Sequence, residues 1–517
     1  MTTLDWSVIG LYLIAMLALA VYLGRKQGSR EDYYLGGNRL PGWALASSII
    51  ATQCSTNSLL GAPAFVGFVI GGGLLWLQYE LAVPLAMLGL CIFFVPIYRS
   101  RVISIYAYLE QRLGLGARLV ASGCFLFFRG VATGVTVYGV ASVIGLVTGI
   151  PVAWSVLLLM GITVTYDAPG GMRAVVVSDV LQMILLLAAV LVALVWLAEP
   201  LTLHFDALQE RARPLQNDWG LASGNNYGFW PMLFGGLFLY MAYYGCDQSQ
   251  AQRLLSAQNE RQLRQILVLN GVLRFPLVLA YCLVGLGLAA YALEHSDFVS
   301  SLPLTASGSP NYNLVFPAFV AREFAPGLAG LAIVGLFAAA MSSIDSALNS
   351  LSASTVEDFI ARFKALPERS MFLISKLTTV FWGLFAVAFS FQVEHIAPTV
   401  LEAINKVGSM ANGPLLMLFT LAIVRPQLGQ APAIIGFAGG LLGNLLIWIL
   451  LPSVSWLWWN ITGFAVGWLL ALAAGVYAGR GAQRGEVLSL PRSAATQLLL
   501  MFLLILAVCI LLWWPWA

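Results

Sequence analysis

Two otherwise apolar segments are interrupted by polar runs, Ala51-Thr-Gln-Cys-Ser-Thr-Asn-Ser58 and Tyr240-Met-Ala-Tyr-Tyr-Gly-Cys-Asp-Gln-Ser-Gln250. Unwound backbone persists at the depth of a membrane only where it lines a cavity or binds something. Two interrupted helices at corresponding positions of two halves therefore predict an inverted-repeat transporter with its site near the midplane. The alternative is that these Ser, Thr and Asn side chains only hydrogen-bond within a helix interface.

The composition around these runs is that of a membrane protein. The chain has 517 residues, of which 60% are hydrophobic and 9% are charged, against roughly 25% charged in a soluble domain. This excludes a soluble enzyme and a disordered hub, because a soluble chain must place much of its surface in water. The net charge of +3 indicates no basic face for nucleic acid.

A bilayer crossing needs about 20 mostly apolar residues, and on that basis we predict an all-α integral membrane protein with about fourteen spans. Spans two and seven contain the polar runs. Because they are five apart, a repeat of spans 2–6 in spans 7–11 is inverted, which predicts a 5+5 core. The predicted spans are 5–24, 41–70, 73–98, 117–147, 151–166, 174–198, 227–247, 264–293, 326–361, 370–393, 397–424, 430–451, 455–478 and 494–516.

These spans divide the chain into a predicted first helix and loop, two repeats with a loop between them, and peripheral C-terminal helices. The boundaries are 1–40, 41–198 (repeat 1), 199–226 (an extracellular loop), 227–424 (repeat 2) and 425–517. With the N-terminus outside, the inside loops carry most of the 26 Lys and Arg residues, Arg253 among them. The outside loops then carry only Arg211, Arg213 and Arg322. Positive residues favour the cytoplasmic side, so we predict a multi-pass protein of the cell membrane with its N-terminus outside.

Cysteine and histidine patterns give no sign of a metal or redox centre. All six cysteines lie in apolar stretches without a paired spacing, and there are only three histidines. We therefore expect no organic cofactor, no enzymatic activity, and no metal other than a transported cation. A monomer in the lipid bilayer is expected to suffice for function.

Five stretches together resemble the sodium/solute symporter family, from about Tyr33 to Ile423. The strongest is Ala338-Ala-Ala-Met-Ser-Ser-Ile-Asp-Ser-Ala-Leu-Asn-Ser350, and the others are 34–43, 105–113, 170–182 and 245–257. The following stretch, Thr355-Val-Glu-Asp-Phe359, looks most like the branch that carries iodide, vitamins and monocarboxylates. The resemblance implies a leucine-transporter-type core in spans 2–11, with extra helices at both ends.

The resemblance also implies a sodium site between the first polar run and the ninth span. Its ligands would be three backbone carbonyls and two hydroxyls, those of Ala51, Cys54, Ala339, Ser342 and Ser343. Such neutral oxygens suit a small, hard cation that must also be released. The alternative for the serine pair is hydrogen bonding to the preceding carbonyls of its own helix.

Two carboxylates, Asp179 and Asp345, lie in predicted spans near this site. An Asp at bilayer depth costs roughly 2.5–3.5 kcal/mol on insertion scales, so both are expected to have a function or a partner. Asp345 lies three residues beyond Ser342 and therefore on the same helical face. Some family members bind a second sodium ion at positions matching Asp179, Ser342, Asp345 and Ser346. Those members have a serine where this chain has Asp345, so Asp345 could strengthen a second site or carry a proton. Alternatively, it pairs with a buried base such as Lys406.

Two further intramembrane charges, Glu80 and Arg274, suggest a substrate site. In sugar carriers of the family, Tyr, Glu and Lys at the positions of Tyr79, Glu80 and Arg274 contact the sugar. The same resemblance places five more positions at or near the substrate, namely Ser58, Tyr240, Tyr243, Tyr244 and Asn405. Arg in place of Lys weakens the sugar interpretation, because its planar fork also suits a substrate carboxylate. The alternative is a Glu80–Arg274 salt bridge that only braces two helices.

We therefore predict a sodium-coupled secondary symporter that imports a small polar solute by alternating access. The solute would be a sugar or polyol, or a small organic acid. The alternatives are a proton-coupled carrier of the same fold, suggested by Asp179 and Asp345, and a non-transporting membrane sensor.

Overall fold

The computed structural model describes residues 2–24, 29–54, 56–305, 308–393, 400–477 and 489–513, with side chains except at 24, 56–57, 400–407 and 513. Within these residues the structure is helical, and its only β-type pairing is one isolated bridge between Leu304 and Pro310. This agrees with the predicted all-α class.

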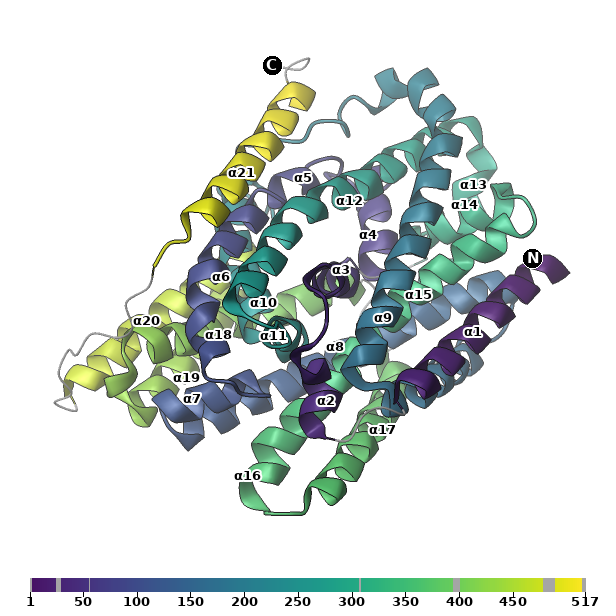
Figure 1. Ribbon diagram of the computed structural model, residues 1–517. Helices are drawn as coiled ribbons and strands as arrows, with labels where there is room; N and C mark the ends of the chain where they lie inside the picture. Colours follow the sequence, from purple (N-terminus) through teal and green to yellow (C-terminus); the bar gives the residue numbers. More distant parts are fainter. Residues whose placement is uncertain are drawn as a thin grey trace.

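Twenty-one α-helices make up the described chain (Figure 1). They are α1 (Thr3–Gly24), α2 (Arg30–Leu35), α3 (Gly42–Gln53), α4 (Thr56–Gly67), α5 (Trp76–Tyr79), α6 (Ala82–Arg99), α7 (Ile105–Arg112), α8 (Leu115–Thr148), α9 (Val152–Leu203), α10 (Gly236–Cys246), α11 (Gln248–Leu255), α12 (Glu260–Glu294), α13 (Ser296–Ser300), α14 (Val315–Glu323), α15 (Leu328–Ser354), α16 (Ala361–Phe363), α17 (Glu368–Val393), α18 (Val400–Val424), α19 (Gln430–Leu450), α20 (Trp459–Tyr477) and α21 (Arg492–Trp513). Short 3-10 or π-helical turns lie at Gly36–Asn38, Phe205–Leu208, Pro231–Gly235, Tyr312–Leu314, Thr355–Ile360, Pro426–Leu428 and Trp456–Trp458.

Ten helical segments of the described chain are long and apolar enough to cross a membrane. The predicted count of about fourteen is not confirmed, although α9 agrees with one predicted boundary. It merges the predicted spans 151–166 and 174–198, yet its backbone leaves helical geometry at Gly171, with φ 56° and ψ −167°. Only glycine adopts this conformation readily, so the residue breaks one long apolar run into two helices. Two further apolar helices, Ser58–Gly67 and Gly408–Val424, are shorter than a full crossing.

Both predicted helix interruptions are confirmed. In the first, α3 ends at Gln53, Cys54 caps it, and α4 begins at Thr56. In the second, α10 ends at Cys246, and Asp247 takes an extended conformation with φ −89° and ψ 121°. The Asp247 side chain then accepts a hydrogen bond from the Ser249 amide and starts α11. Each interruption exposes backbone groups that a continuous helix would pair internally.

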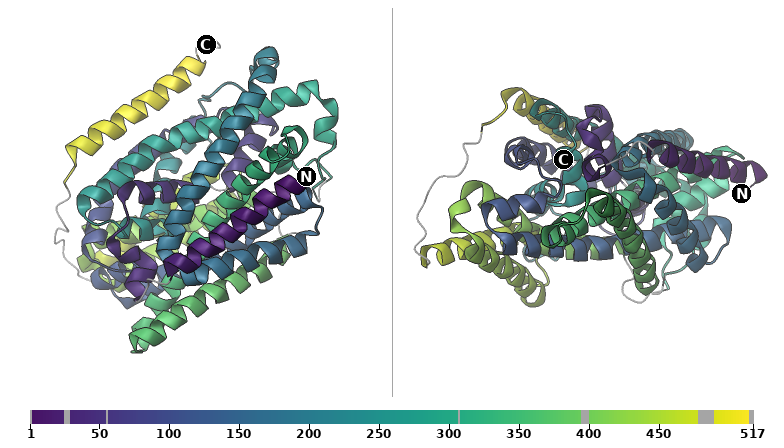
Figure 2. Two further views of the ribbon diagram at one scale, coloured as in Figure 1. Left: turned by 45° about the vertical axis from the view of Figure 1, so that its right-hand side comes forward. Right: turned by 60° about the horizontal axis from the view of Figure 1, so that its bottom comes forward.

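Burial separates central from peripheral helices. In the most apolar window of the segment that contains α15, 89% of the residues are buried, against 17% for α1 and 28% for α17 and α21. Figure 1 shows α3 near the middle of the bundle, between α9 and α12. Figure 2 shows α1 and α21 along the outside. The broken helices and α15 therefore share the interior, where the site residues lie.

Candidate functional site

A buried polar cluster forms where α3, α9, α11 and α15 meet, and its centre is Asp179 of α9. Ser342 Oγ of α15 donates a hydrogen bond to Asp179 Oδ1 at 2.5 Å. Ser48 of α3 donates to Asp179 Oδ2, and Arg253 Nη2 of α11 donates to the same oxygen at 3.1 Å. All four side chains are at most 1% exposed. The structure thus gives the predicted intramembrane Asp179 both a base and two hydroxyl donors.

Arg253 is a site residue that sequence reasoning missed, and its placement in a cytoplasmic loop was wrong. Its guanidinium donates to the Ser48 hydroxyl at 2.6 Å, to the Ser249 carbonyl at 2.6 Å, and to the Ser346 hydroxyl. The interruption at Asp247 starts α11, which carries Arg253 back into the bundle. Its position just after a helix break was the sequence signal that could have revealed it.

Asp345 of α15 has polar partners other than a base. The Tyr166 hydroxyl of α9 donates to its Oδ2, and the Ser346 amide donates to its Oδ1 at 2.6 Å. Ser346 also lies 3.1 Å from the Thr52 hydroxyl of α3, oxygen to oxygen. The suggested partner, Lys406, lies outside the described side chains. Asp179, Asp345 and Ser346 are therefore brought together, with Arg253 already between two of them.

The predicted sodium ligands lie next to this cluster. Ser343 Oγ donates to the Thr52 carbonyl at 3.1 Å and lies 3.4 Å from the Ala339 carbonyl. The carbonyl end of the broken helix α3 thus faces the hydroxyls of α15, as the prediction requires. The buried Cys54 carbonyl accepts a hydrogen bond from the Tyr281 hydroxyl at 3.5 Å, and Ala51 is 4% exposed. Neutral oxygens at the negative end of a helix dipole fit a monovalent cation.

A second polar group joins α5 and the residue that caps it to α10 and α12. Arg274 of α12 binds both carboxylate oxygens of Glu80, through Nε at 2.7 Å and Nη2 at 2.9 Å. The hydroxyls of Tyr240 and Tyr244 lie 2.6 Å and 3.4 Å from guanidinium nitrogens of Arg274. The Tyr79 ring lies 4.8 Å from the Tyr240 ring, centroid to centroid. Five of the predicted substrate residues therefore form one group, a buried ion pair and the three tyrosines beside it.

The other predicted substrate residues lie elsewhere. The Tyr243 hydroxyl accepts a hydrogen bond from Gln250 Nε2 at 2.9 Å. Tyr243 also interacts with Arg129, whose guanidinium lies 3.7 Å from the Asp247 carboxylate. Ser58 donates to the Gln53 carbonyl across the first helix break at 3.2 Å. Asn405 lies outside the described side chains.

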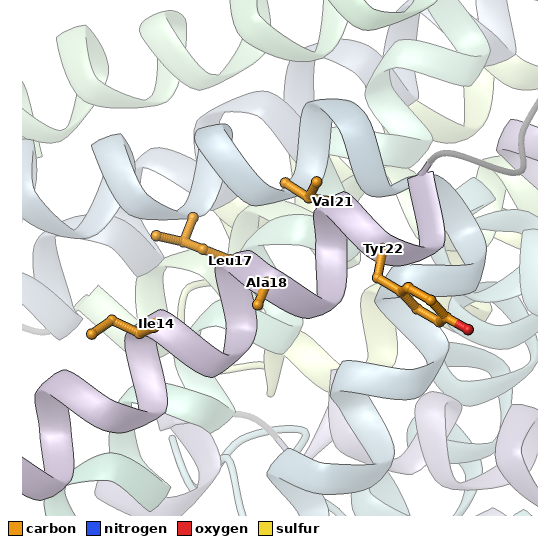
Figure 3. Close-up of a pocket in the computed structure, with 5 residues that line it drawn as sticks. All are labelled: Ile14, Leu17, Ala18, Val21 and Tyr22. Carbon is orange, nitrogen blue, oxygen red and sulfur yellow. The ribbon is translucent and has the colours of Figure 1, made fainter.

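An apolar hollow of about 500 Å³ lies on the outer helix α1 (Figure 3), and none of its lining residues belongs to these polar groups. Its lining residues are Ile14, Leu17, Ala18, Val21 and Tyr22. Because α1 is a candidate membrane span with little of its surface buried, this face meets lipid chains. The hollow is therefore a lipid-facing surface feature, and it adds nothing to the polar site.

We expect Arg253→Lys to lower the melting temperature of the purified protein in detergent, equivalent to about 1–2 kcal/mol. A lysine keeps the charge, but its single ammonium cannot reproduce the planar fork that joins four partners. The matched control is Arg261→Lys, an exposed residue at the start of α12, which should leave the melting temperature unchanged. Equal melting temperatures for both variants would show that the Arg253 contacts add no stability.

The arrangement defines a class of protein. A bundle of membrane-spanning helices in which two broken helices face a buried polar interior is the architecture of a secondary transporter.

The chain belongs to the sodium:solute symporter family, whose family model matches residues 33–443. It is 29% identical to the sodium-dependent multivitamin transporter of Oryctolagus cuniculus over 477 residues, covering 87% of this chain and 70% of that protein. It is 28% identical to the sodium/iodide cotransporter of Homo sapiens over 460 residues, covering 87% and 70%. Sodium is thus the coupling ion of the family to which the chain belongs.

A solved structure of a Na+-coupled sialic acid symporter in its substrate-bound, outward-open state shares the fold. The two superpose with a TM-score of 0.81 at 22% sequence identity, covering 95% of this chain and all of the other. At this identity the likeness establishes the leucine-transporter-like fold alone. The functions of individual residues must be argued from this chain.

Proposed function

We propose that this protein is a sodium-coupled symporter that imports a small hydroxylated solute by alternating access. Family membership supports sodium coupling. The observation that carries the proposal is the pairing of two polar groups around the broken helices, one suited to a cation and one to a solute. The solute and the ion would bind from outside, and the core would then open to the cytoplasm.

The proposed sodium site consists of the carbonyls of Ala51, Cys54 and Ala339 with the hydroxyls of Ser342 and Ser343. It is supported by the 3.1 Å contact from Ser343 to the Thr52 carbonyl, which brings the end of α3 against α15. Sodium bound there would link two helices that belong to different halves of the chain. By stabilising the arrangement of these helices that binds the solute, sodium would raise the affinity for the solute. Linkage then requires the solute to raise the affinity for sodium by the same factor.

The proposed solute site is the group around Glu80 and Arg274. Glu80 occupies the Nε and Nη2 edge of Arg274, so a substrate carboxylate would have to displace Glu80 to bind that edge bidentately. Hydroxyl groups can instead bond to the remaining lone pairs of Glu80 and to the tyrosine hydroxyls. This favours a sugar or polyol. The names of the relatives favour an anion, since iodide and sialic acid are anions. A hydroxylated organic acid satisfies both arguments.

The halves 41–198 and 227–424 are proposed as the inverted repeats. Each begins with a helix that is interrupted, near Cys54 in one and at Asp247 in the other. The segments 1–40 and 425–517 are proposed as peripheral, and we propose a multi-pass protein of the cell membrane whose N-terminus lies outside, as the distribution of Lys and Arg favours. A monomer would contain both polar groups in full.

We propose a second cation at Asp179, Asp345 and Ser346 only for an arrangement of the site in which Arg253 has moved. The Arg253 guanidinium contacts both Asp179 and Ser346, so a metal cation there would have to displace it or share the oxygens. This geometry favours a single sodium ion in the arrangement described.

The deciding experiment measures the melting temperature of the purified protein against sugars, polyols, monocarboxylates and hydroxylated acids, in sodium and in potassium. A ligand raises the stability of the state that it binds, by about 2.7 kcal/mol at a hundred times its dissociation constant. We expect one solute class to raise the melting temperature in sodium only. Equal stabilisation in both salts, following pH instead, would establish the proton-coupled alternative. No stabilisation by any solute or by sodium would favour the sensor.

A further inference from the structure

Asp167 is a buried carboxylate that the proposed function does not use. It lies on α9 and has no exposed surface. Neither of its carboxylate oxygens has a hydrogen-bond partner among the described residues. A bare carboxylate in an apolar interior is far more costly than the neutral acid, because nothing replaces the water it loses. This makes Asp167 unlike the hydrogen-bonded Asp179 and Asp345.

Asp167 lies beside the polar cluster described above, because the adjacent Tyr166 donates its hydroxyl to Asp345 of that cluster. Asp167 lies within electrostatic range of Asp179, Asp345 and Arg253. The titratable groups that face it or its carboxylate neighbours from the packed elements are Tyr166 on α9, Tyr33 on α2 and Tyr12 on α1. Three carboxylates against one guanidinium leave two uncompensated negative charges if all of them ionise. Buried charge of this kind requires protons or cations to offset it.

The hydrogen bonds indicate where a proton belongs. Asp179 accepts from Arg253, Ser48 and Ser342, and Asp345 accepts from a tyrosine hydroxyl and a backbone amide. Donors of this kind stabilise the ionised form of both groups. Asp167 has no such donor, so of the three carboxylates it is the one whose protonation lowers the free energy of the cluster most.

We propose that Asp167 binds a proton, and that this proton is linked to sodium binding in the neighbouring cluster. The proposal rests on sodium binding as proposed above, and adds a residue and a second ion to it. A proton on Asp167 removes one negative charge from the cluster, so it weakens the attraction for a cation nearby. Reciprocity then requires that bound sodium lower the proton affinity of Asp167 and release the proton.

The first test needs no variant. Sodium chloride is added to the purified wild-type protein in weakly buffered detergent solution with a pH indicator, and choline chloride is the control salt. We expect sodium, and not choline, to release protons at some pH between about 5.5 and 8.5. Sodium that raises the melting temperature without releasing protons anywhere in this range would overturn the proposal and leave sodium coupling intact. Sodium with no effect on the melting temperature would instead contradict the proposed function.

The second test assigns the proton to Asp167. In the wild type, the sodium concentration for half-maximal stabilisation should rise about tenfold as the pH falls across the same range. Asp167→Asn mimics the neutral acid at every pH. The sodium concentration for its half-maximal stabilisation should therefore stay at the high value that the wild type shows at acid pH. Glu199→Gln is the matched control, because Glu199 lies exposed on the same helix, and it should behave as the wild type. An Asp167→Asn protein that keeps the wild-type pH dependence and proton release would assign the proton elsewhere and overturn the proposal.

Discussion

Replacing Ser342 by alanine is expected to abolish sodium stimulation of transport while leaving the protein folded. The hydroxyl of Ser342 is a proposed sodium ligand and also donates to Asp179 at 2.5 Å. Without it the bound cation has one neutral oxygen fewer, and the affinity for sodium should fall by about tenfold or more, equivalent to about 1.4 kcal/mol. Sodium concentrations that saturate the wild type should then no longer stimulate uptake. The folding cost should be about 1 kcal/mol, because Asp179 keeps its bonds to Ser48 and Arg253. Solute uptake into proteoliposomes against sodium concentration measures the effect.

Ser350→Ala is the matched control for Ser342→Ala. Ser350 is also buried on α15, and its hydroxyl donates to the Ala347 carbonyl of its own helix at 2.9 Å. This substitution should therefore leave the sodium dependence unchanged. Wild-type sodium dependence in a folded Ser342→Ala protein would rule out the assigned site.

The sequence was sufficient to predict the membrane class and both helix interruptions. Apolar runs and polar breaks are local patterns, so they can be read without knowing which helices touch. The span count as a whole is not confirmed, but the predicted boundary between residues 166 and 174 contains Gly171, where the backbone leaves helical geometry. The family resemblance led to residues that the structure does bring together, such as Glu80 with Arg274.

The rest of the site depended on three-dimensional contacts that a sequence does not encode locally. Arg253 was assigned to a loop because it lies between the predicted spans 227–247 and 264–293, in a stretch too polar to count as a span. The turn at Asp247 sends it inward instead. Asp167 was overlooked because it stands near the end of an apolar stretch, where a carboxylate commonly meets water. Only the packing of α9 against its neighbours shows that it has none.

Breaking the Glu80–Arg274 pair is expected to have the largest effect on stability. Arg274→Met leaves Glu80, which is 1% exposed, without its base, and removing one partner of a buried pair costs about 3–5 kcal/mol. Arg99→Met is the matched control. Arg99 also binds its partner Glu260 at 2.7 Å, but its side chain is 59% exposed, and exposed pairs contribute about 0–1 kcal/mol. Thermal unfolding of the three proteins in detergent measures the difference.

The double variant Glu80→Gln with Arg274→Met separates bracing from solute recognition. It removes both buried charges, so much of the stability lost in Arg274→Met should return, since no unpaired ion remains. If the pair only braces α12 against the chain between α5 and α6, transport should return along with stability. We expect stability to return and sodium-dependent uptake to stay lost, because the two charged groups that would hold the solute are gone. Recovery of both would make the pair structural and would move the solute site away from Arg274.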